Sequence, residues 1–231
     1  MSYYYQENRG GGFISSIPPV TRNLILVNIV IFIATVINEN FMIGTFGLFY
    51  PSSHYFRWWQ VVTHMLMHGG IWHIFFNMYT LLIFGMVVER ILGGKKFILF
   101  YFICGLGAAA LQIGTQYIEM QMFLNSDSQS ALQSIVALKS TPTVGASGAI
   151  YGVLMGYAVL FPQSKMTLLF PPVTLSAKWM VVIFAVIELF TGVVGIADGV
   201  AHFAHLGGML IGWLMIKWWR KRGVLFERDV L

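Results

Sequence analysis

Long apolar runs are the feature that most constrains the fold of this chain. A helix that crosses the hydrocarbon core of a membrane needs about 20 predominantly apolar residues. Hydrophobic residues make up 57% of the chain and charged residues only 10%, against about a quarter charged in a soluble domain. We therefore expect an all-α polytopic membrane protein with six transmembrane helices. The predicted segments are 24–37, 71–91, 97–117, 147–161, 179–195 and 203–219.

The distribution of lysine and arginine predicts the orientation of these helices. With both termini in the cytoplasm, only Arg57 and Lys139 of the 14 basic residues fall in outer loops, which leaves twelve on the inner side. This bias follows the positive-inside rule and accounts for the net charge of +5. No basic run is interleaved with aromatic residues, so the charge does not indicate nucleic-acid binding. The outer loops are expected at 38–70, 118–146 and 196–202.

The chain divides into a membrane domain and two short tails. Residues 1–22 read as a short polar cytoplasmic tail without the pattern of a cleaved signal peptide. Residues 23–222 form the predicted membrane domain, and 223–231 a cytoplasmic C-terminal tail. The single cysteine, Cys104, excludes an intramolecular disulfide. The first outer loop is rich in aromatic residues and histidine, which favours a short amphipathic helix at the membrane interface.

Four polar side chains are predicted to lie at one depth in the membrane. Counted at 1.5 Å per residue from the cytoplasmic ends of their helices, Ser147 lies roughly 21 Å up, His205 roughly 18 Å, Asn77 roughly 20 Å and His73 roughly 25 Å. His73 and Asn77 are spaced i,i+4 and share a helix face. In a hydrocarbon core of about 30 Å, all four fall in the outer half.

Each of these residues also has a simpler interpretation. Ser147 alone is typical of a helix cap or a small packing residue, and His205 and Asn77 alone could hydrogen-bond neighbouring helices. Their shared depth favours a hydrolase, because a serine nucleophile needs a histidine base within reach. His73, Asn77 and the backbone N–H groups at the start of the fourth helix could stabilise the oxyanion. A peptide substrate at this depth would be a transmembrane segment.

Glycines recur every four residues on the fourth and sixth helices. Small residues at this spacing let helix backbones approach closely, and ordinary helix packing alone would explain them. If the two glycine faces meet, Ser147 and His205 come together at the outer end of the contact. Tyr151, one turn below the serine, could then stack on the imidazole. The glycines are Gly148, Gly152 and Gly156 on the fourth helix and Gly208 and Gly212 on the sixth.

Four motifs in this order resemble those of rhomboid intramembrane serine proteases. "GASGAIYG" is similar to the family's GxSG nucleophile motif, and "AHLGGMLIG" to its histidine helix. "HMLMHGGIWHIFFN" is similar to its second-helix motif, and "VERILGGKK" to the glutamate–arginine turn that follows. The resemblance extends from about Asn23 to Lys221, nearly the whole chain.

The resemblance implies a rhomboid-like six-helix bundle and a bacterial inner-membrane location. It also implies hydrolysis of single-pass or multi-pass transmembrane substrates, in contact with membrane lipid, near their outer end. Water would reach the site from a cavity open to the outside, no metal or cofactor would be needed, and the dyad would have no acidic partner. The implied roles are Ser147 as nucleophile, His205 as general base, His73, Asn77 and the Ser147 backbone amide as oxyanion hole, and Gly145 and Tyr151 as supporting residues.

One position departs from the family pattern. A Trp-Arg pair is common in the family's first loop, whereas here Trp59 is followed by Gln60, with Arg57 upstream. We expect this loop to be anchored differently, without loss of catalysis, because the chemistry does not use the arginine.

Two alternative assignments concern the base and its partner. His202 lies three residues before His205, and we expect it to cap the helix or to face the cavity. Asp198 could complete a triad, but it lies seven residues before His205 in a loop.

Three alternative functions are also considered. His64, His68 and His73 could bind a metal, but no HExxH motif is present. A transporter could use Glu188, in the middle of the fifth helix, as a proton relay. In a protease we expect an interhelical hydrogen-bonding group, and the sequence alone leaves the role of this residue open. A catalytically inactive relative that binds membrane clients would typically lack the serine or the histidine, and both are present.

Overall fold

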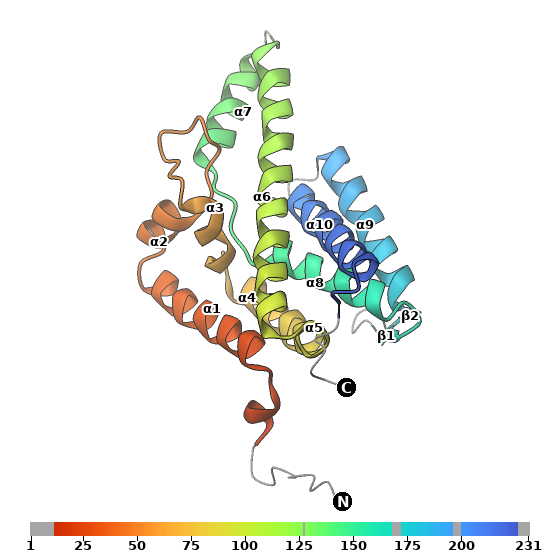
Figure 1. Cartoon of the computed structure of the whole chain (residues 1–231). Coiled ribbons are helices and arrows are strands. Elements are labelled where there is room, and N and C mark those ends of the chain that lie inside the picture. The colour runs from red at the N-terminus through yellow and green to blue at the C-terminus, as the bar shows by residue number, and fades with distance from the viewer. Residues whose placement is uncertain (1–11, 127, 168–171, 196–199, 226–231) are drawn as a thin grey trace, which may run out of the picture.

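The computed structural model describes residues 12–126, 128–167, 172–195 and 200–225 and is mostly helical. All six predicted segments are helices, which confirms an all-α polytopic membrane protein (Figure 1). A π-helical turn, Leu81–Gly85 (η3), joins the two halves of the second segment. The main helices are α1 (Pro19–Ile37), α4 (Ile71–Thr80) with α5 (Met86–Leu92), α6 (Gly94–Leu124), α8 (Ser147–Leu160), α9 (Ala177–Val194) and α10 (His202–Lys221).

Several short elements connect these helices. The segment 38–70 contains three short helices, where its composition predicts one short amphipathic helix. The helix α7 and the small β-hairpin were not predicted, because both are too short and polar to appear as apolar runs. The short elements are η1 (Phe13–Ser16), α2 (Glu39–Phe46), α3 (Gln60–Thr63), η2 (His64–Leu66), α7 (Gln129–Ser140), and the antiparallel pair β1 (Lys165–Thr167) and β2 (Thr174–Ser176).

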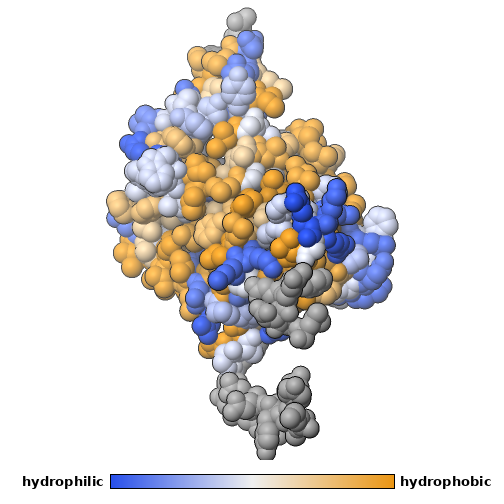
Figure 2. Space-filling model, in the orientation of Figure 1, coloured by the Kyte–Doolittle hydropathy of each residue, from blue (hydrophilic) through white to orange (hydrophobic). Residues whose placement is uncertain are grey.

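The surface of the bundle is suited to lipid. Within the described residues, four helices are long and apolar enough to cross a membrane: Pro19–Ile37, Ile71–Leu92, Gly94–Leu124 and Ala177–Val194. Large apolar side chains are exposed on α1 and α9, Val30 and Phe190 among them at 64% each. Figure 2 shows apolar surface over the middle of the visible face and hydrophilic surface toward its upper left and lower right. The chain is therefore a multi-pass membrane protein in which these side chains contact lipid.

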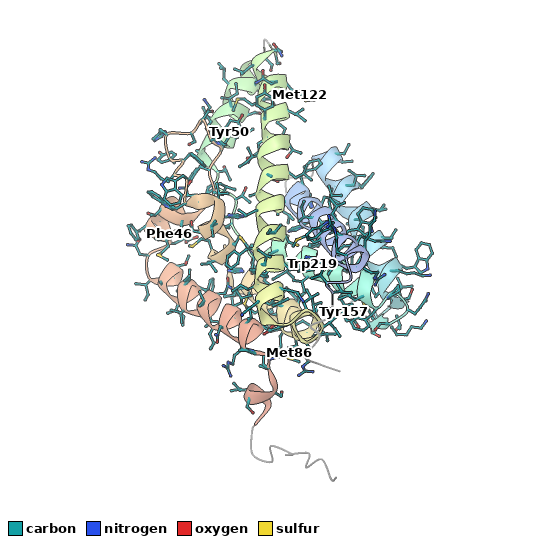
Figure 3. The ribbon with its side chains drawn as sticks, in the orientation of Figure 1. Phe46, Tyr50, Met86, Met122, Tyr157 and Trp219 are labelled. Carbon is teal, nitrogen blue, oxygen red and sulfur yellow. The ribbon has the colours of Figure 1, made fainter. Side chains whose placement is uncertain are left out.

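The lengths of α6 and α8 set the position of the candidate site. The 31 residues of α6 extend about 46 Å, more than the hydrocarbon core of about 30 Å. With α7 it forms a hairpin that projects from one end of the bundle (Figure 1), with Met122 near its tip and Met86 toward the opposite end of the molecule (Figure 3). In contrast, the 14 residues of α8 extend only about 21 Å, so α8 begins inside the bundle.

The helices α8 and α10 are in direct backbone contact through their glycines. A β-carbon at Gly152 would lie 3.0 Å from the carbonyl oxygen of Gly208. A β-carbon at Gly212 would lie 2.6 Å from the carbonyl oxygen of Gly152. The glycine faces therefore meet, as their spacing predicts, because any side chain at these positions would separate the two helices.

The "VERILGGKK" motif ties the start of α1 to the turn between α5 and α6. The buried carboxylate of Glu89 accepts hydrogen bonds from the backbone N–H groups of Val20 (2.9 Å) and Thr21 (2.6 Å), and from the Thr21 hydroxyl (2.7 Å). A carboxylate at this place satisfies free N–H groups of the first turn and interacts favourably with the helix dipole. Arg90 donates to the carbonyl oxygen of Ser16 (2.8 Å).

Candidate active site

Ser147 and His205 are in hydrogen-bond contact although they are 58 residues apart. The Oγ atom of Ser147 lies 2.8 Å from Nε2 of His205. Ser147 is the first residue of α8, whose N-cap is Ala146, and its side chain makes no capping hydrogen bond. The simpler interpretation of Ser147 as the helix cap does not apply, because the N-cap is Ala146 and the Ser147 hydroxyl contacts the histidine instead. The contact follows from the glycine packing of α8 on α10, which brings the N-terminal ends of both helices together.

The imidazole of His205 is held on a flat aromatic surface. The ring of Tyr151 stacks on it, with 4.1 Å between ring centroids and 4° between ring planes. Tyr151 lies one helical turn after Ser147, so one face of α8 supplies both the serine and the ring. The side chain of His205 is buried, with 7% exposed. Its orientation is therefore fixed by packing from α8.

The second nitrogen of His205 faces a carboxylate from a third helix. Oε1 of Glu188, on α9, lies 2.9 Å from Nδ1 of His205. The same oxygen accepts a hydrogen bond from the hydroxyl of Tyr151 (2.5 Å). The resemblance implies a dyad without an acidic partner, whereas here a carboxylate lies in close contact with His205 without a hydrogen bond to it. The sequence signal was a lone carboxylate in an apolar helix, which had to be paired, protonated or in a polar cavity.

The structure also assigns a contact to His202. Its Nδ1 lies 2.7 Å from Oε2 of Glu188 and 3.0 Å from the hydroxyl of Thr191. The N-cap of α10 is Ala201, and His202 is not among the residues that line the cavity described below. Of the two alternatives, cap or cavity, neither describes His202, which is a buried partner of Glu188. Asp198, the alternative acidic partner, lies outside the described residues.

The residues proposed as oxyanion donors surround the turn before Ser147. A β-carbon at Gly145 would lie 2.9 Å from Nε2 of His73 and 3.4 Å from Oγ of Ser147. Gly145 also has φ +135°, a conformation that side chains rarely adopt. Asn77 is buried, and its amide nitrogen donates to the carbonyl oxygen of His73 (3.0 Å). Ser147 itself, as the first residue of α8, carries an N–H without a partner inside the helix.

These residues line one large cavity. The cavity has a volume of about 1080 Å³ and includes His73, Asn77, Gly145, Ser147 and His205 in its wall. It continues along α6 to the projecting hairpin with α7. The α6 residues in its wall, spaced three or four apart on one face, are Gln112, Gln116, Glu119 and Phe123.

The departure at Gln60 has a structural explanation. The side chain is completely buried and its oxygen accepts from the backbone N–H of Arg57 (3.0 Å) and of Phe49 (3.4 Å). Its amide nitrogen donates to the carbonyl oxygens of Tyr55 (3.1 Å) and Thr45 (3.3 Å). One amide therefore anchors four backbone groups of the loop. Only a side chain with both an acceptor and a donor can do this.

His64 and His68 are buried histidines of the loop before α4. Nδ1 of His64 lies 2.9 Å from the carbonyl oxygen of Gln60, so this nitrogen carries the proton. Burial lowers the pKa of His64 to about 4. Burial, with a smaller contribution from His73, lowers the pKa of His68 to about 4 as well. Across the described parts of the chain, no three His, Cys, Asp or Glu side chains are grouped to hold a metal ion.

The fold and the site together define a class: a polytopic helical membrane protein with a serine–histidine pair at a cavity inside the bundle. The Rhomboid domain family matches residues 55–222. The chain belongs to the rhomboid family and is thus a serine-type intramembrane endopeptidase.

Several relatives support this membership. The chain is 28% identical to Rhomboid protease AarA of Providencia stuartii. The similarity covers 85% of this chain and 70% of the Providencia protein. It is 25% identical to Rhomboid protease GlpG of Pectobacterium atrosepticum, over 87% of this chain and 62% of that protein. RHOMBOID-like protein 4 of Arabidopsis thaliana is 30% identical over 68% of this chain, which spans only 33% of the plant protein.

Proposed function

We propose that this protein cleaves transmembrane proteins near the outer face of the membrane, with Ser147 as nucleophile and His205 as general base. The observation that carries the proposal is the contact of 2.8 Å between Ser147 Oγ and His205 Nε2 in the wall of the cavity. A serine is a weak nucleophile unless a base lies within hydrogen-bond reach, and this pair meets that condition.

The reaction begins when the hydroxyl of Ser147 attacks the carbonyl carbon of the scissile peptide bond and its proton passes to Nε2 of His205. The carbonyl oxygen becomes an oxyanion, for which His73, Asn77 and the Ser147 N–H are the proposed donors. His205 then returns the proton to the leaving amine, and the C–N bond breaks. Water activated by the same nitrogen hydrolyses the acyl-enzyme and restores the hydroxyl of Ser147.

The length of α8 supports cleavage in the outer half of the membrane. Ser147 begins this helix, and Val159, near its other end, accepts a hydrogen bond from Arg220 of the basic end of α10 (3.0 Å). Basic residues favour the cytoplasmic side, so Ser147 would lie about 20 Å away from that side. We propose cytoplasmic termini, a bacterial inner-membrane location and a site that opens outward.

The shape of the cavity supports a peptide substrate that continues beyond the membrane. Its wall passes from Ser147 to Gln112, Gln116 and Glu119 on the projecting part of α6. These side chains offer both donors and acceptors for an extended backbone. We place the outer juxtamembrane segment of the substrate along them.

Cleavage of a reporter protein with one transmembrane segment tests the proposal. Purified protein in detergent should cut the reporter near its outer end, as located by mass spectrometry, and Ser147→Ala and His205→Ala should each reduce cleavage to background. Full activity in both variants, or a cut at the cytoplasmic end, would overturn the proposal. Binding of the reporter without any cleavage by the wild type would favour an inactive relative.

A further inference from the structure

A carboxylate beside the catalytic pair takes no part in the reaction described above. Glu188 is 6% exposed and lies on α9, six residues before the end of that helix. Carboxylates inside membrane helices are rare, and they occur where a partner or a function compensates their desolvation. The partners of Glu188 therefore indicate what it does.

Those partners come from two other helices and include the proposed base. The hydroxyl of Tyr151 on α8 donates to Oε1 (2.5 Å), and Nδ1 of His202 on α10 lies 2.7 Å from Oε2. These two contacts fix the carboxylate from both sides. Oε1 is thereby held 2.9 Å from Nδ1 of His205. Nδ1 of His205 has no hydrogen-bond partner, so its contact with Oε1 is an electrostatic one between close atoms.

The proton positions required by the reaction explain why a negative charge is useful there. Ser147 can donate to Nε2 of His205 only if the neutral imidazole carries its proton on Nδ1. When Nε2 accepts the serine proton, the ring becomes a cation next to Oε1. A carboxylate favours both the Nδ1–H form and the cation, as the buried aspartate does in serine protease triads.

We propose that Glu188 is a positioning residue that holds His205 in the Nδ1–H form and stabilises its cation during catalysis. The proposal rests on the proposed function, since it assigns the acidic third member of that site. It differs from the dyad that the family resemblance implies. The charge of Glu188, rather than its size, is the property that matters.

Two variants separate charge from size. Glu188→Gln keeps the length and the acceptor for Tyr151 but removes the charge. Glu188→Asp keeps the charge on a side chain shorter by one methylene. We expect kcat to fall in the order wild type, Glu188→Asp, Glu188→Gln. The loss in Glu188→Gln should be on the order of 10²-fold, smaller than the ~10⁴-fold loss in serine protease triads, because Nδ1 of His205 has no hydrogen-bond partner. KM should change by less than about threefold, since the interaction develops in the transition state.

The control is Glu39→Gln on α2, an exposed carboxylate in the first turn of that helix, which should keep wild-type kcat. Rates are divided by the folded fraction, measured by thermal unfolding of each purified variant. A structural role predicts the reverse order, because glutamine preserves size and hydrogen bonds better than aspartate does. Glu188→Gln with kcat equal to or above that of Glu188→Asp, or with only KM changed, would overturn the proposal.

Two further measurements complete the test. If Ser147→Ala cleaves the reporter as well as wild type, the proposed function fails whatever the result at position 188. If Ser147→Ala is inactive but the order of the Glu188 variants is reversed, only the role of Glu188 fails. Should neither variant accumulate, ¹⁵N NMR of the wild-type imidazole decides the question. A proton on Nδ1 of neutral His205 supports the proposal, and a proton on Nε2 overturns it.

Discussion

Gly212 of α10 lies against the backbone of Gly152 of α8, so closely that a β-carbon at position 212 would be 2.6 Å from the carbonyl oxygen of Gly152. This contact holds together the two helices that carry Ser147 and His205. The geometry of the site thus depends on small residues that lie outside it.

Gly212→Ala should therefore impair catalysis from a distance. Insertion of a methyl group between two backbones costs about 1–3 kcal/mol and would push α10 away from α8. We expect at least a tenfold loss of kcat together with a lower melting temperature. Gly114→Ala on α6 is the matched control, because a β-carbon there would meet nothing within 4 Å. Equal activity of the two variants would contradict the packing account.

Gly145→Ala should abolish activity while leaving most of the stability intact. The new β-carbon would lie 2.9 Å from Nε2 of His73, in a backbone conformation with φ +135°. Gly195→Ala provides the control, because Gly195 also has positive φ (+71°) but open space around it. The control should lose about 1 kcal/mol of stability and keep its kcat. If both variants lose kcat equally, backbone strain rather than crowding of the site is responsible.

Glu89→Gln should destabilise the protein without changing its chemistry. Glutamine has one acceptor oxygen where the carboxylate has two, so at least one N–H at the start of α1 loses its partner. A loss of about 1–3 kcal/mol is expected for a buried unsatisfied donor. Thermal unfolding in detergent measures the loss, and kcat per folded enzyme should equal that of wild type. A lower kcat at unchanged stability would contradict this structural role.

Stability should fall in mild acid because of His64 and His68. The ordinary pKa of histidine is 6.5, and burial lowers both values to about 4. The contribution of these two histidines to the free energy of unfolding is thus fully present above pH 6.5. Between pH 6.5 and 4 the unfolded chain binds protons that the folded chain does not, and the free energy of unfolding falls by up to about 1.4 kcal/mol per pH unit for each histidine.

Unfolding of His68→Leu as a function of pH checks this expectation. Both ring nitrogens of His68 are buried, so leucine should be tolerated and should reduce the pH dependence by about half. His54→Gln, at an exposed position, should keep the full pH dependence. An unchanged slope in His68→Leu would show that other groups cause the acid sensitivity.

Depth along a helix could be predicted from the sequence, whereas rotation about it could not. Counting residues from basic helix ends placed Ser147 and His205 at one level, and the glycine spacing indicated which helix faces meet. The partner of Glu188 depends on how α9 is rotated against α10, and nothing in an apolar helix with one carboxylate fixes that angle. The contact of His202 with Glu188 could not be predicted for the same reason.

The loop regions were predictable only in outline. Aromatic residues in the segment 38–70 indicated a short amphipathic helix, and the structure contains three short helices there, α2, α3 and η2. That Gln60 follows Trp59, where the family commonly has an arginine, was visible in the sequence. Its four backbone partners, however, come from loop residues whose positions only the fold determines. The helix α7 was missed because its composition is that of a polar loop.

The reactivity of Ser147 toward a fluorophosphonate tests the central claim most directly, because this small reagent needs no transmembrane substrate. The account predicts that wild-type protein is modified on Ser147, as located by mass spectrometry. His205→Ala should react at least about 10³-fold more slowly, since the serine then lacks its base. Modification of a different residue, or an unchanged rate in His205→Ala, would contradict the account.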